Sequence, residues 1–182
     1  QAIYDMGWSL PDVSTQTEMD ADKVAEAFIS NIKKYDYDLC FGTYMDHGFG
    51  VPTLGGVLNI PEKFGASVSI KVPPIRQRED WAEVEKRLPL NPLKHDRMPD
   101  ALKALRIVCK ELGNEYPISP AYYTGICAAN IMFRDVADLT LDCVEDPDWV
   151  DKICQAATDF SIDWVRAQYE AGCNSVFYLG DH

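Results

Sequence analysis

The fold is best predicted from residues 146–182, which read DPDWVDKICQAATDFSIDWVRAQYEAGCNSVFYLGDH. Asp146-Pro147-Asp148 is a typical helix opening, because the aspartate accepts hydrogen bonds from free N–H groups and proline suits the first helical position. Acidic side chains are also favoured at the positive end of the helix dipole. Apolar residues then recur at helical spacing on one face: Trp149, Ile153, Ala157, Phe160, Trp164 and Ala171. The stretch therefore predicts a long amphipathic helix.

A buried strand is expected directly after this helix. Gly172 stands where a helix can end in the left-handed conformation. Residues 174–179 are rich in β-forming side chains and carry no charge before Asp181. A helix that feeds such a strand through a short loop is the repeating unit of parallel α/β sheets, whose ligands bind at the carboxyl ends of the strands. Asp181 and His182 therefore stand where a functional site is expected.

Two earlier stretches repeat the order of helix, strand and polar loop. Asp20 opens a helix that extends to about residue 34, and residues 37–44 follow as a strand. A helix over residues 100–112 then leads to a strand over residues 115–119. Three such units predict an α/β fold with a parallel sheet. Right-handed crossovers place the three strand-end loops on one rim.

The region 51–99 interrupts this order and is interpreted as an insertion or linker within the domain. Its glycines and prolines surround an alternating apolar and polar run, which predicts a small antiparallel excursion near residues 57–75. Residues 78–87 predict a short polar helix. His95 follows in a proline-punctuated linker and is expected to be exposed to solvent.

Charge excludes two classes of partner. The formal net charge is −12 and the isoelectric point is near 4.5. Nucleic acid and anionic membranes both require clustered lysine and arginine, so neither is an expected partner. The uncharged run over residues 116–133 is interrupted by prolines and Asn130. A strand, loop and helix inside a protein core is therefore predicted there instead of a bilayer span.

Cysteine usage predicts a reducing compartment. The six cysteines stand singly in apolar segments, with no C-x-x-C pair and no His-x-Cys, so we interpret them as buried, reduced core residues and not as metal ligands or disulfides. With no basic and apolar signal pattern at the start, the protein is expected to be cytoplasmic. The three histidines are far apart, and no zinc site is predicted in this chain.

The rim loops supply the candidate site. Asp46 and Asp181 are the candidate catalytic carboxylates, although Asp46 also fits a solvated loop and Asp181 fits a helix cap. Aromatic walls and imidazoles suit a small, flat ligand, although tyrosines in such loops are also common packing residues. The candidate substrate-binding residues are Tyr44, His47, Ser119, Tyr122, Tyr123, Thr124 and His182.

The second half of the chain resembles a known family. The resemblance is carried by ALKALRIVCKELG at residues 101–113, YPIS at 116–119, AYYT at 121–124, EDP at 145–147 and AQYEAG at 167–172. These residues look like the uroporphyrinogen decarboxylase superfamily, which includes the decarboxylase and corrinoid-dependent methyltransferases. The resemblance covers roughly residue 20 to the end. It implies a (β/α)8 TIM barrel, of which residues 1–182 are expected to be the N-terminal part without the C-terminal half.

Departures from the decarboxylase pattern favour the methyltransferase branch. The resemblance implies an arginine-rich loop after the first strand, which would clamp the carboxylates of a porphyrinogen, yet the first arginine is Arg76. Arg76, Arg78 and Arg87 are expected to lie away from the rim. A methyltransferase that transfers a methyl group between a corrinoid and a small acceptor is therefore the favoured function. A divergent decarboxylase and a non-catalytic binding or assembly subunit are the alternatives.

Cofactors and partners follow from the same resemblance. No cofactor is expected in this chain, whereas zinc and a corrinoid protein are implied for the intact methyltransferase. A small-molecule substrate is expected at the rim. The strand over residues 174–179 would be an open sheet edge in a partial barrel, so we expect it to pair with the remaining half or with a second copy.

Overall fold

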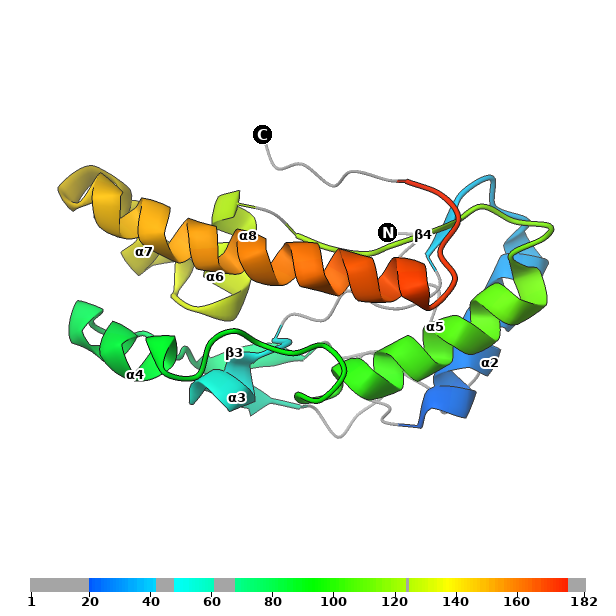
Figure 1. Cartoon of the computed structure of the whole chain (residues 1–182), viewed down its shortest axis with the longest axis horizontal. Helices are drawn as coiled ribbons and strands as arrows, with labels where there is room; N and C mark the ends of the chain where they lie inside the picture. Colours follow the sequence, from blue (N-terminus) through cyan, green and yellow to red (C-terminus); the bar gives the residue numbers. More distant parts are fainter. Residues whose placement is uncertain (1–19, 42–47, 61–67, 124, 177–182) are drawn as a thin grey trace.

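The computed structural model describes residues 20–41, 48–60, 68–123 and 125–176 (Figure 1). Its elements are, in chain order, α2 (Ala21–Tyr35), β1 (Cys40–Phe41), α3 (Val51–Leu54), β2 (Val57–Asn59), β3 (Ser69–Val72), the 3-10 helix η1 (Arg78–Asp80), α4 (Trp81–Glu85), α5 (Met98–Leu112), β4 (Ile118–Ser119), α6 (Gly125–Met132), α7 (Val136–Glu145) and α8 (Pro147–Glu170). The described chain is thus a mixed α/β structure.

A parallel pair of short strands confirms the predicted strand direction. Cys40 of β1 pairs with Ile118 of β4, and Phe41 pairs with Ser119. Because the strands are parallel, the segments that follow them leave from the same edge. This edge is the rim on which the sequence places two candidate loops. Both strands are fully buried, as expected for a parallel sheet covered by helices.

The antiparallel excursion predicted near residues 57–75 is also present. β2 pairs with β3 in antiparallel register, with Val57 opposite Val72 and Asn59 opposite Ser69. Alternate residues of β3 are exposed, which explains the alternating sequence pattern. This two-stranded sheet is separate from the parallel pair among the described residues. The excursion therefore forms a second small sheet and contributes no strand to the parallel pair.

The long helix α8 begins and ends as the sequence predicts. The Asp146 side chain accepts a hydrogen bond from Trp149 N at 3.2 Å, and Pro147 occupies the first turn. Gly172 follows the helix with a φ of 120°, a conformation that suits glycine. The apolar face of α8 is buried and includes Val150, Ile153, Ala157, Phe160, Trp164 and Ala167. In Figure 1, α6 and α7 lie beside α8.

Residues 174–176 differ from the predicted strand. Asn174 N and Ser175 N both donate to the single carbonyl of Ile118, at 3.0 and 3.2 Å, so a regular ladder does not form. The Asn174 side chain takes the place of the ladder: its Oδ1 accepts from Ile118 N at 2.7 Å and its Nδ2 donates to Gly113 O at 2.6 Å. The rest of the predicted strand, residues 177–179, lies outside the described residues.

Two smaller expectations are wrong. His95 is half-buried instead of exposed, because its Nδ1 accepts a hydrogen bond from Asn91 N at 3.0 Å within the turn that precedes α5. The cysteines are all free thiols, but only Cys40 and Cys173 are buried. The other four are half-buried positions of α5, α6, α7 and α8, outside the fully buried faces of these helices.

A buried ionic cluster ties the segment after β3 to α7. Asp142 is 3% exposed, and its two carboxylate oxygens accept hydrogen bonds from Arg134 Nε and from Arg78 Nη2, the latter at 3.1 Å. Arg78 also reaches Asp146 at 3.0 Å, so it contacts the cap of α8. Arg134 Nη1 donates to Arg76 O at 3.0 Å. The cluster therefore joins three segments that are distant in sequence.

This cluster sets the ionisation of Asp142. Burial alone would raise the pKa of the Asp142 carboxyl, but the hydrogen bonds and charges of Arg134 and Arg78 outweigh burial and hold the pKa below its ordinary value. A depressed pKa means that the carboxylate stabilises the fold at neutral pH. That contribution is lost as the pH falls through the depressed pKa.

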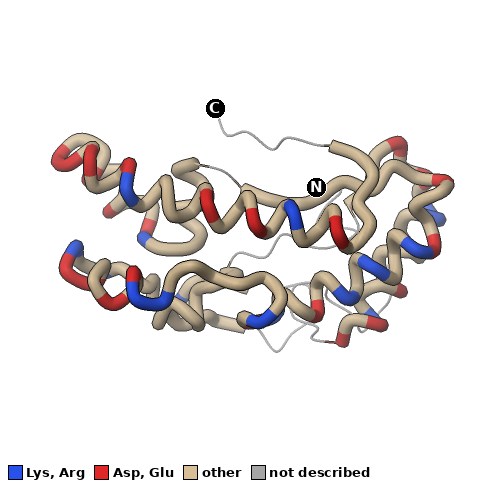
Figure 2. Tube along the Cα trace, in the orientation of Figure 1, with Lys and Arg blue, Asp and Glu red and all other residues tan. Residues whose placement is uncertain are grey.

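The charged side chains are spread over the surface. Figure 2 shows lysine and arginine interspersed with aspartate and glutamate on α2, α5 and α8. No described helix carries a long enough apolar run to cross a membrane. The core lies between the helices, where α2 and α5 pack together and α8 covers the strand-end loops.

We predict unequal effects of removing the two sides of the ionic cluster. Asp142→Ala leaves the buried Arg134 without its carboxylate and is expected to lower the free energy of unfolding by about 3–5 kcal/mol. Arg78→Ala removes a side chain that is 36% exposed, and the expected loss is about 1 kcal/mol or less. Urea unfolding of both variants measures the difference, and equal losses would contradict this account of the cluster.

Candidate functional site

The segment that leaves β4 runs along α8 and forms the centre of the candidate site. Ser119 is the last residue of β4, and Pro120, Ala121, Tyr122 and Tyr123 follow as an extended rim loop without helix or strand. Proline restricts the residue before it to extended backbone, which continues the direction of the strand into the loop. We refer to residues 120–123 as the rim loop.

The main chain of Ala121 is held by Gln168 of α8. Ala121 N donates to Gln168 Oε1 at 2.9 Å, and Gln168 Nε2 donates to Ala121 O at 3.0 Å. The glutamine amide thus satisfies both hydrogen-bonding groups of one residue, as a neighbouring strand would. Gln168 is 0% exposed and Ala121 is 1% exposed. These hydrogen bonds are shielded from water, so breaking them would leave buried polar groups unpaired.

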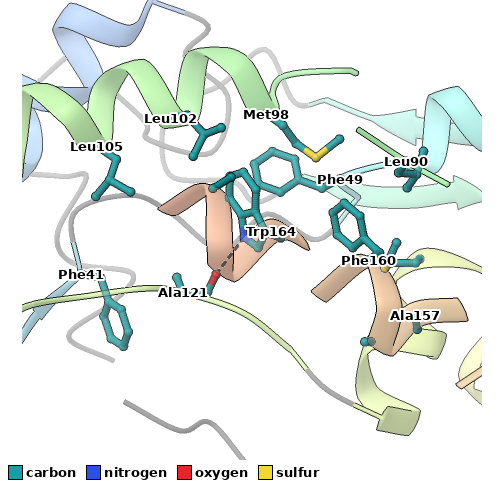
Figure 3. Close-up of a cluster of buried hydrophobic side chains, with 14 of the residues drawn as sticks. Phe41, Phe49, Leu90, Met98, Leu102, Leu105, Ala121, Ala157, Phe160 and Trp164 are labelled. Atoms are coloured by element: carbon teal, nitrogen blue, oxygen red, sulfur yellow. Dashed lines mark hydrogen bonds between the residues drawn. The ribbon is translucent and has the colours of Figure 1, made fainter. Parts of the chain in front are cut away.

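Two further side chains of α8 hold the same loop. Trp164 Nε1 donates to Ala121 O at 2.9 Å (Figure 3), and Ser161 Oγ donates to Tyr123 O at 2.7 Å. Residues 161, 164 and 168 lie on one face of the helix, because they are three and seven positions apart. This face therefore combines apolar packing with hydrogen bonds to the rim loop.

Trp164 also connects the rim loop to the loop that precedes α3. Its ring meets the ring of Phe49 edge to face, with centroids 5.1 Å apart and an interplanar angle of 69°. Figure 3 shows Phe49 and Trp164 together, with Met98 and Leu102 of α5 beside them. The two strand-end loops are therefore packed on one side chain of α8.

Asp96 fixes the loop that carries Phe49. Its Oδ2 accepts a hydrogen bond from Gly50 N at 2.8 Å. Gly50 has a φ of 84°, a left-handed conformation that favours glycine, and a Cβ atom there would lie 2.4 Å from Leu90 Cδ1 and force that side chain to shift. Burial raises the pKa of the Asp96 carboxyl above its ordinary value, although the hydrogen bond from Gly50 N opposes this shift.

An apolar cavity lies between the rim loop and the helices. It has a volume of about 30 Å³, which accommodates about two water molecules. None of its lining residues is charged; they are Phe49, Ala121, Tyr122, Tyr123, Ala128, Ile131, Met132, Phe160, Ser161 and Trp164. A larger groove of about 280 Å³ is lined by Tyr122 and, on α8, by Thr158, Ser161, Ile162, Val165 and Arg166. Tyr122 therefore lines both spaces.

The structure describes three of the residues that the sequence proposes for the site. Tyr122 and Tyr123 are half-buried and line the cavity, whereas Ser119 is fully buried with its hydroxyl 3.4 Å from Pro120 O. The other candidates lie outside the described residues, and their roles stay predictions: Tyr44, Asp46, His47, Thr124, Asp181 and His182.

The arginines near the excursion contact protein groups away from the rim loop. Arg78 binds the acidic residues described above, and Arg87 Nη1 lies 3.3 Å from Thr53 O. The Arg76 carbonyl accepts from Arg134 while its side chain is exposed. In the described part of the chain, none of these three arginines lines the cavity beside Tyr122.

Metal ligands do not gather in the described chain. Within residues 20–41, 48–60, 68–123 and 125–176, no group of three or more His, Cys, Asp or Glu side chains converges. The zinc site that the resemblance implies belongs to the intact methyltransferase, and it stays a prediction. The acids at the cluster around Asp142 are neutralised by arginine.

Sequence reasoning missed the residues that hold the rim loop. Gln168 and Ser161 are polar residues on the apolar face of α8, and this displacement from the polar face was the available signal. Asp96 gave a weaker signal, because its left-handed φ of 50° is visible only in the structure. Their hydrogen-bond partners are main-chain atoms 38 to 47 positions away.

The arrangement of strands and helices identifies the class of protein, and the sequence comparison then identifies the family. A parallel strand pair with a helix before each strand is typical of α/β proteins, whose ligands bind at the carboxyl ends of the strands. The family model for uroporphyrinogen decarboxylase matches residues 12–179. The chain therefore belongs to the uroporphyrinogen decarboxylase family. A comparison with curated proteins gives no match.

We predict that Gln168 is required for stability out of proportion to its size. Gln168→Leu keeps the volume but leaves Ala121 N without an acceptor, so the free energy of unfolding is expected to fall by about 1–3 kcal/mol. Gln155→Leu is the matched control, because Gln155 is an exposed glutamine on the same helix; a change within about 0.5 kcal/mol is expected there. Guanidinium unfolding measures both variants. Similar losses in the two would show that the hydrogen bonds between Gln168 and Ala121 do not stabilise the fold.

The raised pKa of Asp96 predicts that replacing its carboxylate with a neutral amide increases the stability of the protein in a pH-dependent way. Asp96→Asn keeps an oxygen that accepts from Gly50 N and removes the buried charge, and asparagine tolerates left-handed backbone. Because a raised pKa favours the folded state at low pH, the variant is expected to be more stable than the wild type at neutral pH. The gain is expected to vanish below about pH 4, where both side chains are neutral.

Asp96→Ala provides the control for this prediction. It removes the acceptor and puts alanine in left-handed backbone, so a loss of about 1–3 kcal/mol is expected at both pH values. Thermal melts across the pH range measure both variants. If Asp96→Asn is destabilised as much as Asp96→Ala at neutral pH, the charge of Asp96 is needed for the loop.

Proposed function

We propose that the intact protein is a corrinoid-protein-dependent methyltransferase of this family, which transfers a methyl group between a corrinoid and a small acceptor. The observation that carries the proposal is the uncharged, aromatic character of the cavity beside the rim loop. A porphyrinogen carries several carboxylates, and a site for it would need guanidinium groups directed at the ligand. The cavity described here suits an apolar or neutral group instead.

The use of the arginines supports the same conclusion. Arg134 is 7% exposed, and its guanidinium is bound to Asp142 and to the Arg76 carbonyl. Arg78 is bound to the carboxylates of Asp142 and Glu145 in α7 and of Asp146, the cap of α8. Recruiting either one to a substrate would leave Asp142 buried with fewer counter-charges, which is costly.

The rim loop gives this chain a positioning role in the transfer. Gln168, Trp164 and Ser161 hold main-chain atoms of the loop, so Tyr122 and Tyr123 are presented from a fixed backbone. A fixed wall lowers the entropic cost of orienting a small acceptor beside the methyl donor. A corrinoid, when bound to its partner protein, would supply or receive the methyl group. The described residues of the rim loop and α8 would exclude water from one side of the acceptor.

An assay on the intact protein tests the proposal. Methylcobalamin and a simple alkyl thiol serve as donor and acceptor, and loss of the cobalt–carbon bond is followed by absorbance against a protein-free blank. In parallel, uroporphyrinogen is supplied and its products are separated by chromatography. We expect demethylation without porphyrinogen decarboxylation. Decarboxylation without demethylation would establish the decarboxylase alternative. The absence of both reactions would favour a binding subunit. Each of these two results would contradict the proposal.

Substitutions in the rim loop refine this test. Tyr122→Ala is expected to lower the transfer rate by about tenfold or more, because the acceptor loses one wall of its site. Tyr35→Ala is the matched control, since Tyr35 is a tyrosine that is 49% exposed on α2, away from the rim loop. Its transfer rate is expected to equal that of the wild type.

A further inference from the structure

Two cysteines from distant parts of the sequence lie against each other behind the rim. Cys109 is near the end of α5, and Cys173 follows α8. The two thiols lie near enough for each to shift the pKa of the other. Both are free thiols; Cys173 is buried and Cys109 is half-buried. The proposed transfer chemistry uses neither of them.

The backbone around both thiols is fixed. A Cβ atom on Gly172 would lie 2.8 Å from Cys109 Cβ and 3.5 Å from its Sγ, so the chain beside Cys173 passes directly over the Cys109 side chain. Cys173 N donates to Gln168 O at 3.2 Å, and Asn174 Nδ2 donates to Gly113 O at 2.6 Å. These contacts on both sides keep the two cysteines adjacent.

The two thiols differ in chemical character. The interaction with Cys173 lowers the pKa of Cys109 below its ordinary value, although burial opposes this shift. The same interaction, together with burial, raises the pKa of Cys173. Cys109 is thus the better nucleophile and is also the more accessible of the two. Such a pair, an accessible reactive thiol beside a resolving thiol, is typical of oxidisable sites.

We propose that Cys109 and Cys173 form a reversible disulfide when the protein meets a peroxide. The Cys109 thiolate attacks one oxygen of hydrogen peroxide, the O–O bond breaks, and the leaving hydroxide takes up a proton to give water. The resulting sulfenic acid is attacked by Cys173; the S–S bond forms, the S–O bond breaks, and a second water leaves with the Cys173 proton. Two sulfur atoms are oxidised and the peroxide is reduced.

The bridge would act on the base of the rim loop. Asn174, the residue after Cys173, binds both Ile118 N and Gly113 O. A covalent link from Cys173 to α5 closes a loop that contains β4 and the whole of α8. Oxidation therefore restricts the separation of α8 from the strand whose rim loop it holds.

Another thiol pair provides an internal comparison. Cys143 of α7 and Cys154 of α8 lie near enough for Cys143 to influence Cys154, but burial and the charge of Asp151 raise the pKa of Cys154. Burial also raises the pKa of Cys40 to about 11. The thiols of Cys154 and Cys40 therefore stay protonated at neutral pH and are expected to react more slowly than Cys109.

The test treats the intact, folded protein with a small excess of hydrogen peroxide. We expect two of the six thiols to disappear, a mass decrease of about 2 Da, and a peptide map in which Cys109 is joined to Cys173. A dithiol reductant is expected to restore both thiols. The Cys143→Ser/Cys154→Ser double variant is expected to form the same bridge, whereas Cys109→Ser and Cys173→Ala are expected to form none.

The wild-type peptide map alone decides the outcome, so a variant that fails to fold does not affect it. The proposal is overturned if all six thiols survive, if the bridge joins Cys143 to Cys154, or if Cys109 accumulates as sulfinic acid while Cys173 remains a thiol. A mixed bridge between two protein molecules, seen as a covalent dimer, would also overturn it.

Discussion

The hydrogen bonds to the main-chain N–H and C=O of Ala121 are the constraint on which the described site depends. An extended loop at the end of a strand exposes main-chain groups that must find partners, and within the described part of the chain no strand pairs with residues 120–123. Gln168 and Trp164 replace that neighbour with side chains of α8. Once the loop is fixed on the helix, the position of Tyr122 and the shape of the cavity follow. A shift of α8 along its axis would therefore also move the rim loop.

The helices could be predicted from the sequence because their signals are local. The Asp20 and Asp146 caps, the apolar faces of α2, α5 and α8, and the glycine after α8 are all determined within a few neighbouring residues. The antiparallel excursion was predictable for the same reason, since the alternation in β3 directly records which side is exposed. The parallel direction of β1 and β4 followed from the helix between them.

The parts that could not be predicted depend on contacts between distant residues. Asn174 looked like the start of a strand, but its side chain competes for Ile118 N and leaves residues 174–176 without a ladder. Arg78 looked like part of a polar surface helix, yet it reaches the acids of α7 and α8. For the candidate site, the sequence predicted the loop with Tyr122 and Tyr123. It did not predict the side chains of α8 that hold this loop.

The clamp on the rim loop grips atoms that every amino acid possesses. Gln168, Trp164 and Ser161 bind the N–H and C=O groups of Ala121 and the C=O group of Tyr123, and none of them requires a particular side chain at residue 122. Residue 122 can therefore be exchanged in evolution without displacing the backbone beneath it. Relatives that keep the glutamine and the tryptophan can diverge in the ligand they recognise, with new specificity arising by substitution on an unchanged support.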